Sequence, residues 1–536
     1  MALSRRAFLG ATAAAGLAGL VRVEGQTVSS PRRVFRHGVA SGDPLADRVI
    51  LWTRVTPPGA TAAAVTAAAI DVTWEIAADA AFRRPVARGA VQTGEERDWT
   101  VKIDAGGLTP ATAYYYRFVA LGERSPAGRT KTLPSRAADH VRFAVASCAN
   151  YPYGFFNAYG RIAARPDLDA VLHLGDYLYE YENGRYGDGT PYGRVSSPDR
   201  EIISLWDYRT RHAQYKTDPD LQEAHRQHPW IVVWDDHEVA NNTWRDGAEN
   251  HQPDHGDGDW LARRDAAVQA FFEWMPIRED RATRQPRIYR TLPFAGLVDL
   301  IMLDTRVIDR DEQPARRDAL AIVDDPSRSL LGRAQEQWLY RELAESKRAG
   351  IRWQVLGQQV MFAPLSLPGA TSASTDTWEG YRPARQRLID VLENQRMENV
   401  VVLTGDVHSS WGYDVPRDPW SGYEAASGRG SLAIEIVAPS ITSPSGFGTP
   451  EEGAARVAKL LKERPHLKYV DGALRGYVVV DITRERVQAD WYYVPTVTAK
   501  TTAEQFGKGL VSAADNPHLA DAASPVATRS SADPAP

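Results

Sequence analysis

The chain has 536 residues, of which 43% are hydrophobic and 24% charged, so it can bury a large core and is not a disordered, fibrous or collagenous protein. That length allows about three or four domains, or one large domain with a smaller companion. Its 63 Lys and Arg against 68 Asp and Glu give a net charge of −5, and we find no nucleic-acid-binding signature. The single cysteine excludes an intramolecular disulfide, a zinc finger and an iron–sulfur site.

The first residues have the features of an export signal. Arg5 and Arg6 precede an uncharged run at 7–21, which is too short to span the roughly 30 Å hydrocarbon core of a bilayer as a helix. An amphipathic helix is the alternative, but the run shows no polar face. The arginine pair resembles a twin-arginine signal. We therefore predict a signal peptide at 1–30, the twin-arginine export machinery as a partner, a periplasmic or extracellular location, and no transmembrane segment in the mature chain.

Residues 31–134 are predicted to form an all-β domain. Short segments alternate apolar and polar residues with period two and are separated by Gly and Pro, which is typical of an antiparallel β-sandwich of the fibronectin or immunoglobulin kind. No catalytic cluster occurs among them, so we expect a scaffold or docking domain. The segments lie at 48–55, 70–76, 99–103 and 113–119.

Residues 135–500 are predicted to form an α/β catalytic domain. Six segments are apolar along their length, as in strands buried on both faces, and helical stretches at 261–274 and 333–347 lie between some of them. Each apolar segment is followed by polar residues, which such sheets bring together at the carboxyl ends of their strands. The segments lie at 141–147, 170–174, 230–234, 299–303, 352–356 and 400–403.

The tail at 501–536 is rich in Ala, Thr, Ser, Asp and Pro, so we expect it to be partly disordered. Composition leaves open whether residues 504–510 form a short helix over the site.

Four of the residues after the strands suit a strongly Lewis-acidic ion. Cys148 offers a thiolate, Asp176 a carboxylate that can bridge two ions, Tyr179 a phenolate and His408 an imidazole, a set that suits Fe³⁺. Taken alone, a cysteine at a strand end is usually a small buried hydrophobe, and Gly-Asp is commonly a turn. His173, in mid-strand, is interpreted as a core or supporting histidine. The joint occurrence of these residues favours the metal site.

A second set contains only carboxylates, namely Asp176, Asp236 and Asp406. Hard oxygen ligands favour Ca²⁺, Mg²⁺ or Mn²⁺ over zinc. Because Asp176 belongs to both sets, the two ions would lie about 3.5–4 Å apart, as in two-metal hydrolases.

These residues carry a resemblance to a known family. Gly-Asp-x-x-Tyr at 175–179, Asp-His-Glu at 236–238 and Gly-Asp-x-His at 405–408 resemble the calcineurin-like metallophosphoesterase superfamily. Within it, the chain is similar to the alkaline phosphatase D (PhoD-like) family over roughly residues 33–500. Further matching segments are 38–44, 52–54, 147–148, 234–235, 241–242, 303–306, 357–359 and 441–444.

The resemblance implies a four-layer α/β/β/α catalytic domain that hydrolyses phosphate mono- or diesters. It implies Fe³⁺ and one or two Ca²⁺ ions, with Mn²⁺, Zn²⁺ or Mg²⁺ as substitutes. The chain has Cys148, Asp236 and Asp406 where the broader superfamily has metal-binding Asp, Asn and His, which makes zinc at the second site doubtful. By motif, the iron ligands would be Cys148, Asp176, Tyr179 and His408, and the calcium ligands Asp176, Asp236 and Asp406.

The expected mechanism is in-line attack on phosphorus by a hydroxide held between the two ions. His237, oriented by Glu238, is predicted to protonate the leaving group. For Arg306 the alternative is a structural ion pair with Asp304 or another acid. Contacts to phosphate are predicted for Asn242, Arg306 and Gln359.

Two other functions are compatible with the sequence. One is a phosphodiesterase of phospholipase D type, or one that cleaves a cell-wall polymer, on the same site. The other is an envelope-binding protein with an inactive phosphatase fold, although every matched ligand position still carries a competent donor. Aromatic residues that would line a groove for an extended substrate, or else belong to the core, are Trp206, Tyr208, Trp244, Trp260 and Trp378.

Overall fold

The computed structural model describes residues 34–57, 69–279, 286–315, 322–369, 374–448 and 450–536. The predicted signal peptide, residues 1–30, lies outside these ranges. Within them, no helix is both long and apolar enough to cross a membrane.

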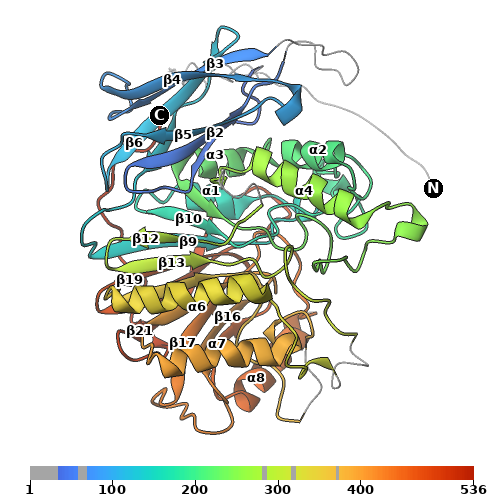
Figure 1. Cartoon of the computed structure of the whole chain (residues 1–536), viewed down its shortest axis with the longest axis vertical. Helices are drawn as coiled ribbons and strands as arrows, with labels where there is room; N and C mark the ends of the chain where they lie inside the picture. Colours follow the sequence, from blue (N-terminus) through green and yellow to red (C-terminus); the bar gives the residue numbers. More distant parts are fainter. Residues whose placement is uncertain (1–33, 58–68, 280–285, 316–321, 370–373, 449) are drawn as a thin grey trace, which may run out of the picture.

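Two large sheets form the centre of the molecule (Figure 1). Each contains four neighbouring parallel strands with antiparallel strands at the margins. The ten-stranded sheet has the order β22 (Ala520–Asp521), β21 (Gln505–Ala513), β20 (Arg486–Val494), β19 (Arg475–Thr483), β9 (His140–Ala146), β10 (Ala170–His173), β11 (Pro229–Val232), β1 (Val39–Gly42), β2 (Arg48–Arg54), β5 (Thr100–Gly106). The seven-stranded sheet has the order β12 (Arg290–Phe294), β13 (Val298–Met302), β14 (Trp353–Gly357), β15 (Val400–Thr404), β17 (Ser431–Val437), β16 (Ser410–Pro416), β18 (Leu467–Asp471).

The six predicted apolar segments are strands, three in each sheet: β9, β10 and β11 in one, and β13, β14 and β15 in the other. Their continuous apolar character follows from burial on both faces. In β15, Val401 and Leu403 belong to the core between the two sheets, whereas Val400 and Val402 belong to the core beneath the helices. Side chains alternate between the faces of a strand, so a strand covered on both sides must be apolar at every position.

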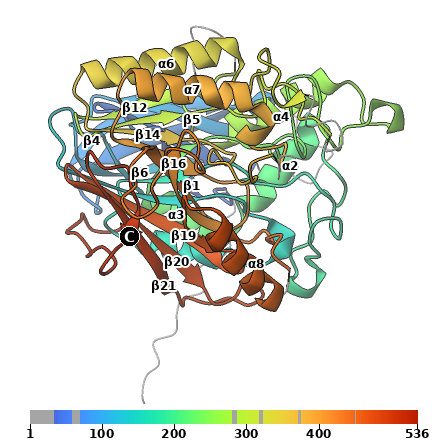
Figure 2. The same ribbon diagram turned by 90° about the horizontal axis from the view of Figure 1, so that it is seen from below.

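Helices cover the outer face of each sheet and complete the predicted four-layer α/β/β/α architecture. The helices α6 (Gly332–Arg348) and α7 (Arg382–Asn394) lie side by side over the seven-stranded sheet (Figures 1 and 2). On the ten-stranded sheet the covering helices are α1 (Asn157–Ala163) and α3 (Pro219–Gln227). Further helices are α2 (Leu205–Tyr215), α4 (Trp260–Trp274) and α8 (Pro450–Glu463). The expected helices at 261–274 and 333–347 correspond to α4 and α6.

The N-terminal all-β domain shares a sheet with the catalytic region. Its own five-stranded sheet packs against β1, β2 and β5, which are the end of the ten-stranded sheet. Strand β1 pairs in parallel with β11, and a side chain at Gly42 would meet the backbone oxygens of Pro276 and Trp230 within 2.6 Å. The two regions therefore form one continuous structure rather than a separate sandwich joined by a linker. The five-stranded sheet contains β4 (Pro85–Thr93), β3 (Ile70–Ala77), β6 (Ala113–Ala120), β7 (Glu123–Arg124) and β8 (Gly128–Lys131).

The structure answers the question that composition left open about the tail. Residues 504–510 do not form a helix: β21 extends the ten-stranded sheet beyond β20, as Figure 2 shows, and β22 pairs with β21. The chain then returns to the N-terminal domain, where the hydroxyl of Tyr115 donates a hydrogen bond to the carbonyl of Asp533 (2.6 Å). The small and polar composition resembled disorder, but the open edge of β20 supplies the hydrogen bonds that order this segment.

Replacing Leu510 tests whether the tail is part of the core. Its side chain is 1% exposed, so Leu510→Ala is expected to lower the free energy of unfolding by about 2–5 kcal/mol. Denaturant unfolding measures this, with Gln505→Ala, an exposed position on the same strand, as the control. Equal stability of both variants and the parent would contradict the ordered tail.

Candidate active site

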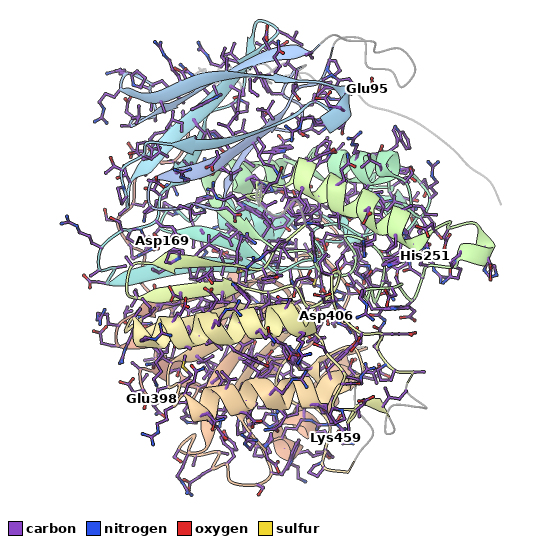
Figure 3. The ribbon with its side chains drawn as sticks, in the orientation of Figure 1. Glu95, Asp169, His251, Glu398, Asp406 and Lys459 are labelled. Atoms are coloured by element: carbon purple, nitrogen blue, oxygen red, sulfur yellow. The ribbon has the colours of Figure 1, made fainter. Side chains whose placement is uncertain are left out.

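The loops that follow the six strands converge at the carboxyl ends of both sheets. The side chains that meet there come from the loops after β9, β10, β11, β13 and β15. Asp406, labelled in Figure 3, lies in the last of these loops. Three groups of potential metal ligands have their donor atoms within 4.8 Å of one another: Cys148, Asp176 and His408; Asp176, Asp236 and His237; and Asp235, Asp236 and Asp406.

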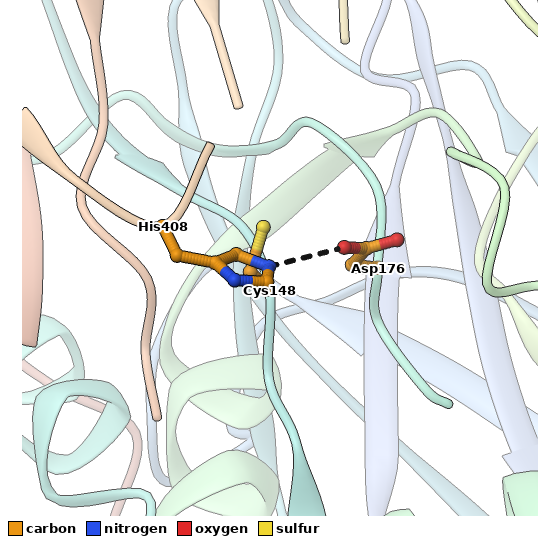
Figure 4. A group of neighbouring side chains, drawn as sticks. All are labelled: Cys148, Asp176 and His408. Carbon is orange, nitrogen blue, oxygen red and sulfur yellow. Dashed lines mark ion pairs between the residues drawn. The ribbon is translucent and has the colours of Figure 1, made fainter. Parts of the chain in front are cut away.

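The first group contains three of the four donors that the sequence analysis assigned to iron, namely Cys148, Asp176 and His408 (Figure 4). His408 Nε2 lies 3.7 Å from Asp176 Oδ2. The hydroxyl of Tyr179 donates to Asp176 Oδ2 (2.9 Å) and lies 3.1 Å from His408 Nε2. His408 Nδ1 lies 2.8 Å from the carbonyl of Pro444, so the Nδ1–H donates there and Nε2 faces the group with its lone pair. The thiol of Cys148, buried, completes the group.

The backbone at these positions is strained. Cys148, Asp176, Asp406 and His408 have φ of 63°, 54°, 63° and 56°, the left-handed region that residues other than glycine rarely adopt. Such conformations cost of order 1–3 kcal/mol each and persist only where the surroundings enforce them. The sharp turns after three strands, β9, β10 and β15, direct these four candidate ligands toward the site. Strain of this kind is typical of functional sites.

The second group surrounds a buried arginine. Arg306 donates from Nη2 to Asp406 Oδ1 (2.7 Å), from Nη1 to Asp376 Oδ1 (2.6 Å) and from Nε to Asp235 Oδ1. Asp236 Oδ1 lies 3.8 Å from Nη2. All three guanidinium nitrogens therefore contact carboxylates, which leaves no open fork for phosphate. Arg306 thus forms ion pairs with acids, as the alternative interpretation expected, although Asp304 is not one of its ion-pair partners.

The charge of this region is unbalanced. Burial and nearby carboxylates raise the pKa of Asp406 to about 7 and the pKa of Asp235 well above its ordinary value, although Arg306 opposes both shifts. Burial and the carboxylate of Asp176 likewise raise the pKa of the Cys148 thiol. Asp176 Oδ1 and Asp235 Oδ2 are buried and have no hydrogen-bond partner among the described residues. Unpaired buried acceptors and a thiol held protonated are what a bound cation would relieve, so the residues fit a metal centre.

His237 is oriented by a different glutamate from the one expected. Its Nδ1 lies 2.6 Å from Glu180 Oε2, and its ring centroid lies 4.2 Å from that of Tyr179. Burial would lower the pKa of His237, but the carboxylates of Glu180, Asp236 and Asp176 together raise it well above its ordinary value.

Glu238 instead ties two of the converging loops together. Its carboxylate accepts the backbone N–H groups of Asp176 (3.0 Å), Tyr177 (2.5 Å) and Asp235 (2.7 Å). The expectation that Glu238 orients His237 is not met, because these backbone contacts hold its carboxylate. Its place in the structure is to fix the loops that present Asp176 and Asp235.

Gln359 and Asn242, both predicted to contact phosphate, have hydrogen-bond partners within the protein. The amide of Gln359 donates to the backbone carbonyls of Trp234 (2.7 Å) and Leu303 (3.0 Å), and its oxygen accepts from the hydroxyl of Thr305 (2.6 Å). Gln359 thus joins the loops after three strands. The side chain of Asn242 donates to Glu249, whereas its backbone N–H donates to Asp236 Oδ2 (2.6 Å).

Three acidic residues of the site were missed by sequence reasoning: Glu180, Asp235 and Asp376. The first two had a signal, since each is an ionisable residue beside a candidate ligand in a run that follows a buried strand. Asp376 had none, because it lies in a polar loop and reaches Arg306 only through the fold.

Of the five aromatic residues considered for a groove, Tyr208, Trp260 and Trp378 are buried, and Trp206 is 53% exposed.

The fold and the site define a class: a four-layer α/β/β/α protein with an all-β N-terminal domain and a carboxylate-rich candidate metal centre. The family model described as PhoD-like phosphatase matches residues 143–491, and the model of the PhoD-like phosphatase N-terminal domain matches residues 22–134. Alkaline phosphatase D of Bacillus subtilis (strain 168) is 40% identical over 476 residues, covering 87% of this chain and 78% of that protein. The solved structure titled "Structure of PhoD" matches with a TM-score of 0.82 and 37% identity, covering 92% of this chain and 93% of the other.

The chain therefore belongs to the PhoD-like phosphatase family and is a phosphoric ester hydrolase.

A substitution at Gln359 separates a structural role from a role in phosphate binding. In Gln359→Leu, the carbonyls of Trp234 and Leu303 and the backbone N–H of Thr305 lose their partner, so the free energy of unfolding is expected to fall by about 1–3 kcal/mol for each group left unpaired. Chemical denaturation measures the loss, and steady-state kinetics are expected to show an unchanged KM. A raised KM at unchanged stability would restore Gln359 to the substrate site.

Proposed function

We propose that the protein is an exported, metal-dependent phosphatase that hydrolyses phosphate mono- or diesters outside the cytoplasm. Family membership supports the hydrolysis, and the arginine pair before an uncharged run supports export by the twin-arginine route. One observation carries the metal dependence: thiol, imidazole and carboxylate donors lie within 4.8 Å of one another in three overlapping groups, and the phenol of Tyr179 contacts Asp176 and His408.

The donor chemistry supports a different ion at each point. Fe³⁺ suits the set that combines sulfur, phenol and imidazole, and Ca²⁺ suits the set that offers only oxygen, with Mn²⁺, Zn²⁺ or Mg²⁺ as substitutes. Bound ions of this kind supply Lewis acidity, which activates water and neutralises phosphate charge. The residues that would hold iron are Cys148, Asp176, Tyr179 and His408, and those that would hold calcium are Asp176, Asp236 and Asp406.

His237 is proposed as the donor to the leaving group. Its Nδ1 is held by Glu180, so the ring presents Nε2 on its opposite side. Burial opposes ionisation of Glu180, but the charge of His237 and several hydrogen bonds hold the pKa of Glu180 below its ordinary value. A carboxylate on Nδ1 fixes the ring and stabilises its protonated form, as a general acid requires.

Arg306 is proposed to position ligands rather than to bind substrate. Its guanidinium fixes Asp406 and Asp235 and supplies one positive charge close to the candidate calcium ligands. A rigid, always charged group holds these carboxylates in one orientation.

Metal content and colour test the ligand assignment. Protein purified without chelators is expected to contain iron and calcium and to absorb visible light, because phenolate and thiolate bound to Fe³⁺ give charge-transfer bands. The absorption is expected to change in Cys148→Ala and Tyr179→Phe. A colourless, active protein that contains only zinc or manganese would disprove the iron site while leaving the phosphoesterase assignment intact.

The role of His237 is tested with matched histidine variants. His237→Ala is expected to lower kcat by about 10²- to 10⁴-fold with metal content unchanged, because the leaving group loses its proton donor. Glu180→Gln is expected to lower kcat by a smaller factor. His255→Ala, an exposed histidine in the same connection, is the control. Full turnover of 4-nitrophenyl and phenyl phosphates by His237→Ala would remove His237 from the mechanism.

A further inference from the structure

Behind His237, a chain of polar side chains extends past Glu180 to three residues that the proposed mechanism does not use. It runs from Glu180 through Asn250 and Glu201 to Arg263. Asn250 lies in the long connection between β11 and α4, next to His251, which Figure 3 labels. Glu201 lies shortly before α2, and Arg263 lies in the first turn of α4. Segments that are distant along the sequence thus contribute one member each.

Glu180 is held on both carboxylate oxygens. Oε2 contacts His237 Nδ1 at 2.6 Å, while Oε1 accepts from the backbone N–H of Asn241 (2.7 Å) and from Asn250 Nδ2 (2.8 Å). Three donors therefore determine where this carboxylate lies. A carboxylate held in this way leaves the imidazole one favourable orientation.

Asn250 connects Glu180 to a second acid. The two hydrogens on its Nδ2 allow it to donate to Glu180 and also to Glu201 Oε1 (3.2 Å). The reverse orientation of the amide would place its oxygen against two carboxylates, so the orientation is fixed by charge. Glu201 in turn accepts from Arg263 Nη2 (2.7 Å).

Arg263 anchors the far end of the chain. Its side chain is fully buried, and it also donates to the backbone carbonyl of Asn250 (3.2 Å) and to the hydroxyl of Tyr208 (3.2 Å). A buried guanidinium is rigid and always charged, so it fixes Glu201 and the connection that carries Asn250. Donors and acceptors alternate without a break from the helix to the imidazole.

We propose that Asn250, Glu201 and Arg263 are positioning residues for His237, acting through Glu180. The proposal rests on the role of His237 as proton donor given above. Loss of the Asn250 amide would free Glu180 to turn, and the imidazole would then meet the leaving group in a poorer geometry. Misplacement of a catalytic group by a fraction of an ångström to an ångström lowers turnover without removing the group.

The test compares leaving groups. Asn250→Asp keeps the shape but removes both donors, and it is expected to lower kcat about 10- to 100-fold on phenyl phosphate with little change in KM. The loss on 4-nitrophenyl phosphate is expected to be smaller, because that leaving group needs less protonation. Gln252→Ala, an exposed residue of the same connection, is the control and is expected to match the parent.

A second variant and a double-mutant cycle distinguish the positioning role from a general loss of structure. Glu201→Gln leaves the Asn250 amide an acceptor but removes the charge that Arg263 holds, and a smaller loss with the same leaving-group dependence is expected. When Asn250→Asp is combined with Glu180→Gln, the loss of kcat is expected to be smaller than the sum of the two separate losses in free energy, because both substitutions affect the orientation of the His237 imidazole. Melting temperatures and metal content are measured on every variant.

Each outcome decides the proposal. Equal losses on both substrates, full additivity with Glu180→Gln, or unchanged kcat in Asn250→Asp would each overturn the positioning role. If His237→Ala shows the leaving-group dependence and Asn250→Asp does not, only the positioning chain fails. If His237→Ala itself shows no such dependence, the proton-donor role fails and the positioning role fails with it.

Discussion

The structure depends on the burial of acidic groups where two sheets meet. Asp176, Asp235 and Asp236 lie in the interior, and the buried guanidinium of Arg306 contacts Asp235 and Asp236. Buried carboxylates are costly unless they are paired, and here two of their oxygens have no partner among the described residues. Left-handed backbone at the candidate ligands adds strain to that cost. The cations proposed for this site would offset the cost of burying these carboxylates.

In the surrounding framework, two buried side chains link the loops by hydrogen bonds to their backbone groups. Glu238 joins the loops after β10 and β11, and Gln359 joins the loops after β11, β13 and β14. The ten-stranded sheet continues through β1 into the N-terminal domain at one end and through β21 into the tail at the other. The loops that carry the ligands therefore stand on strands whose positions are set by both sheets. Preorganisation of this kind allows charge to be stabilised without movement during the reaction.

Within the site, charged side chains divide into two networks. Arg306 with Asp376 lies on the side of Asp406, and Glu180 with Asn250 lies on the side of His237. The first network fixes carboxylates, and the second fixes an imidazole. Each ends in a buried arginine that is fully enclosed, which gives both networks a charge that does not vary with pH in the physiological range.

The sequence by itself determined the class of fold, the six strands and the residues at their ends, because an apolar run buried on both faces and a polar residue after it are local features. It also placed Cys148, Asp176 and His408 among the residues that would converge. Only the tertiary structure decided that Glu180 rather than Glu238 contacts His237, that Gln359 is bound to backbone, and that the tail forms a strand. Those outcomes depend on partners far along the chain: Arg306 and Asp406 are 100 residues apart, and Asn250 and Glu180 are 70 apart. The hydrogen-bonding partner of a side chain depends on which groups the packed sheets bring within about 3 Å of it. The local sequence pattern does not determine those distances.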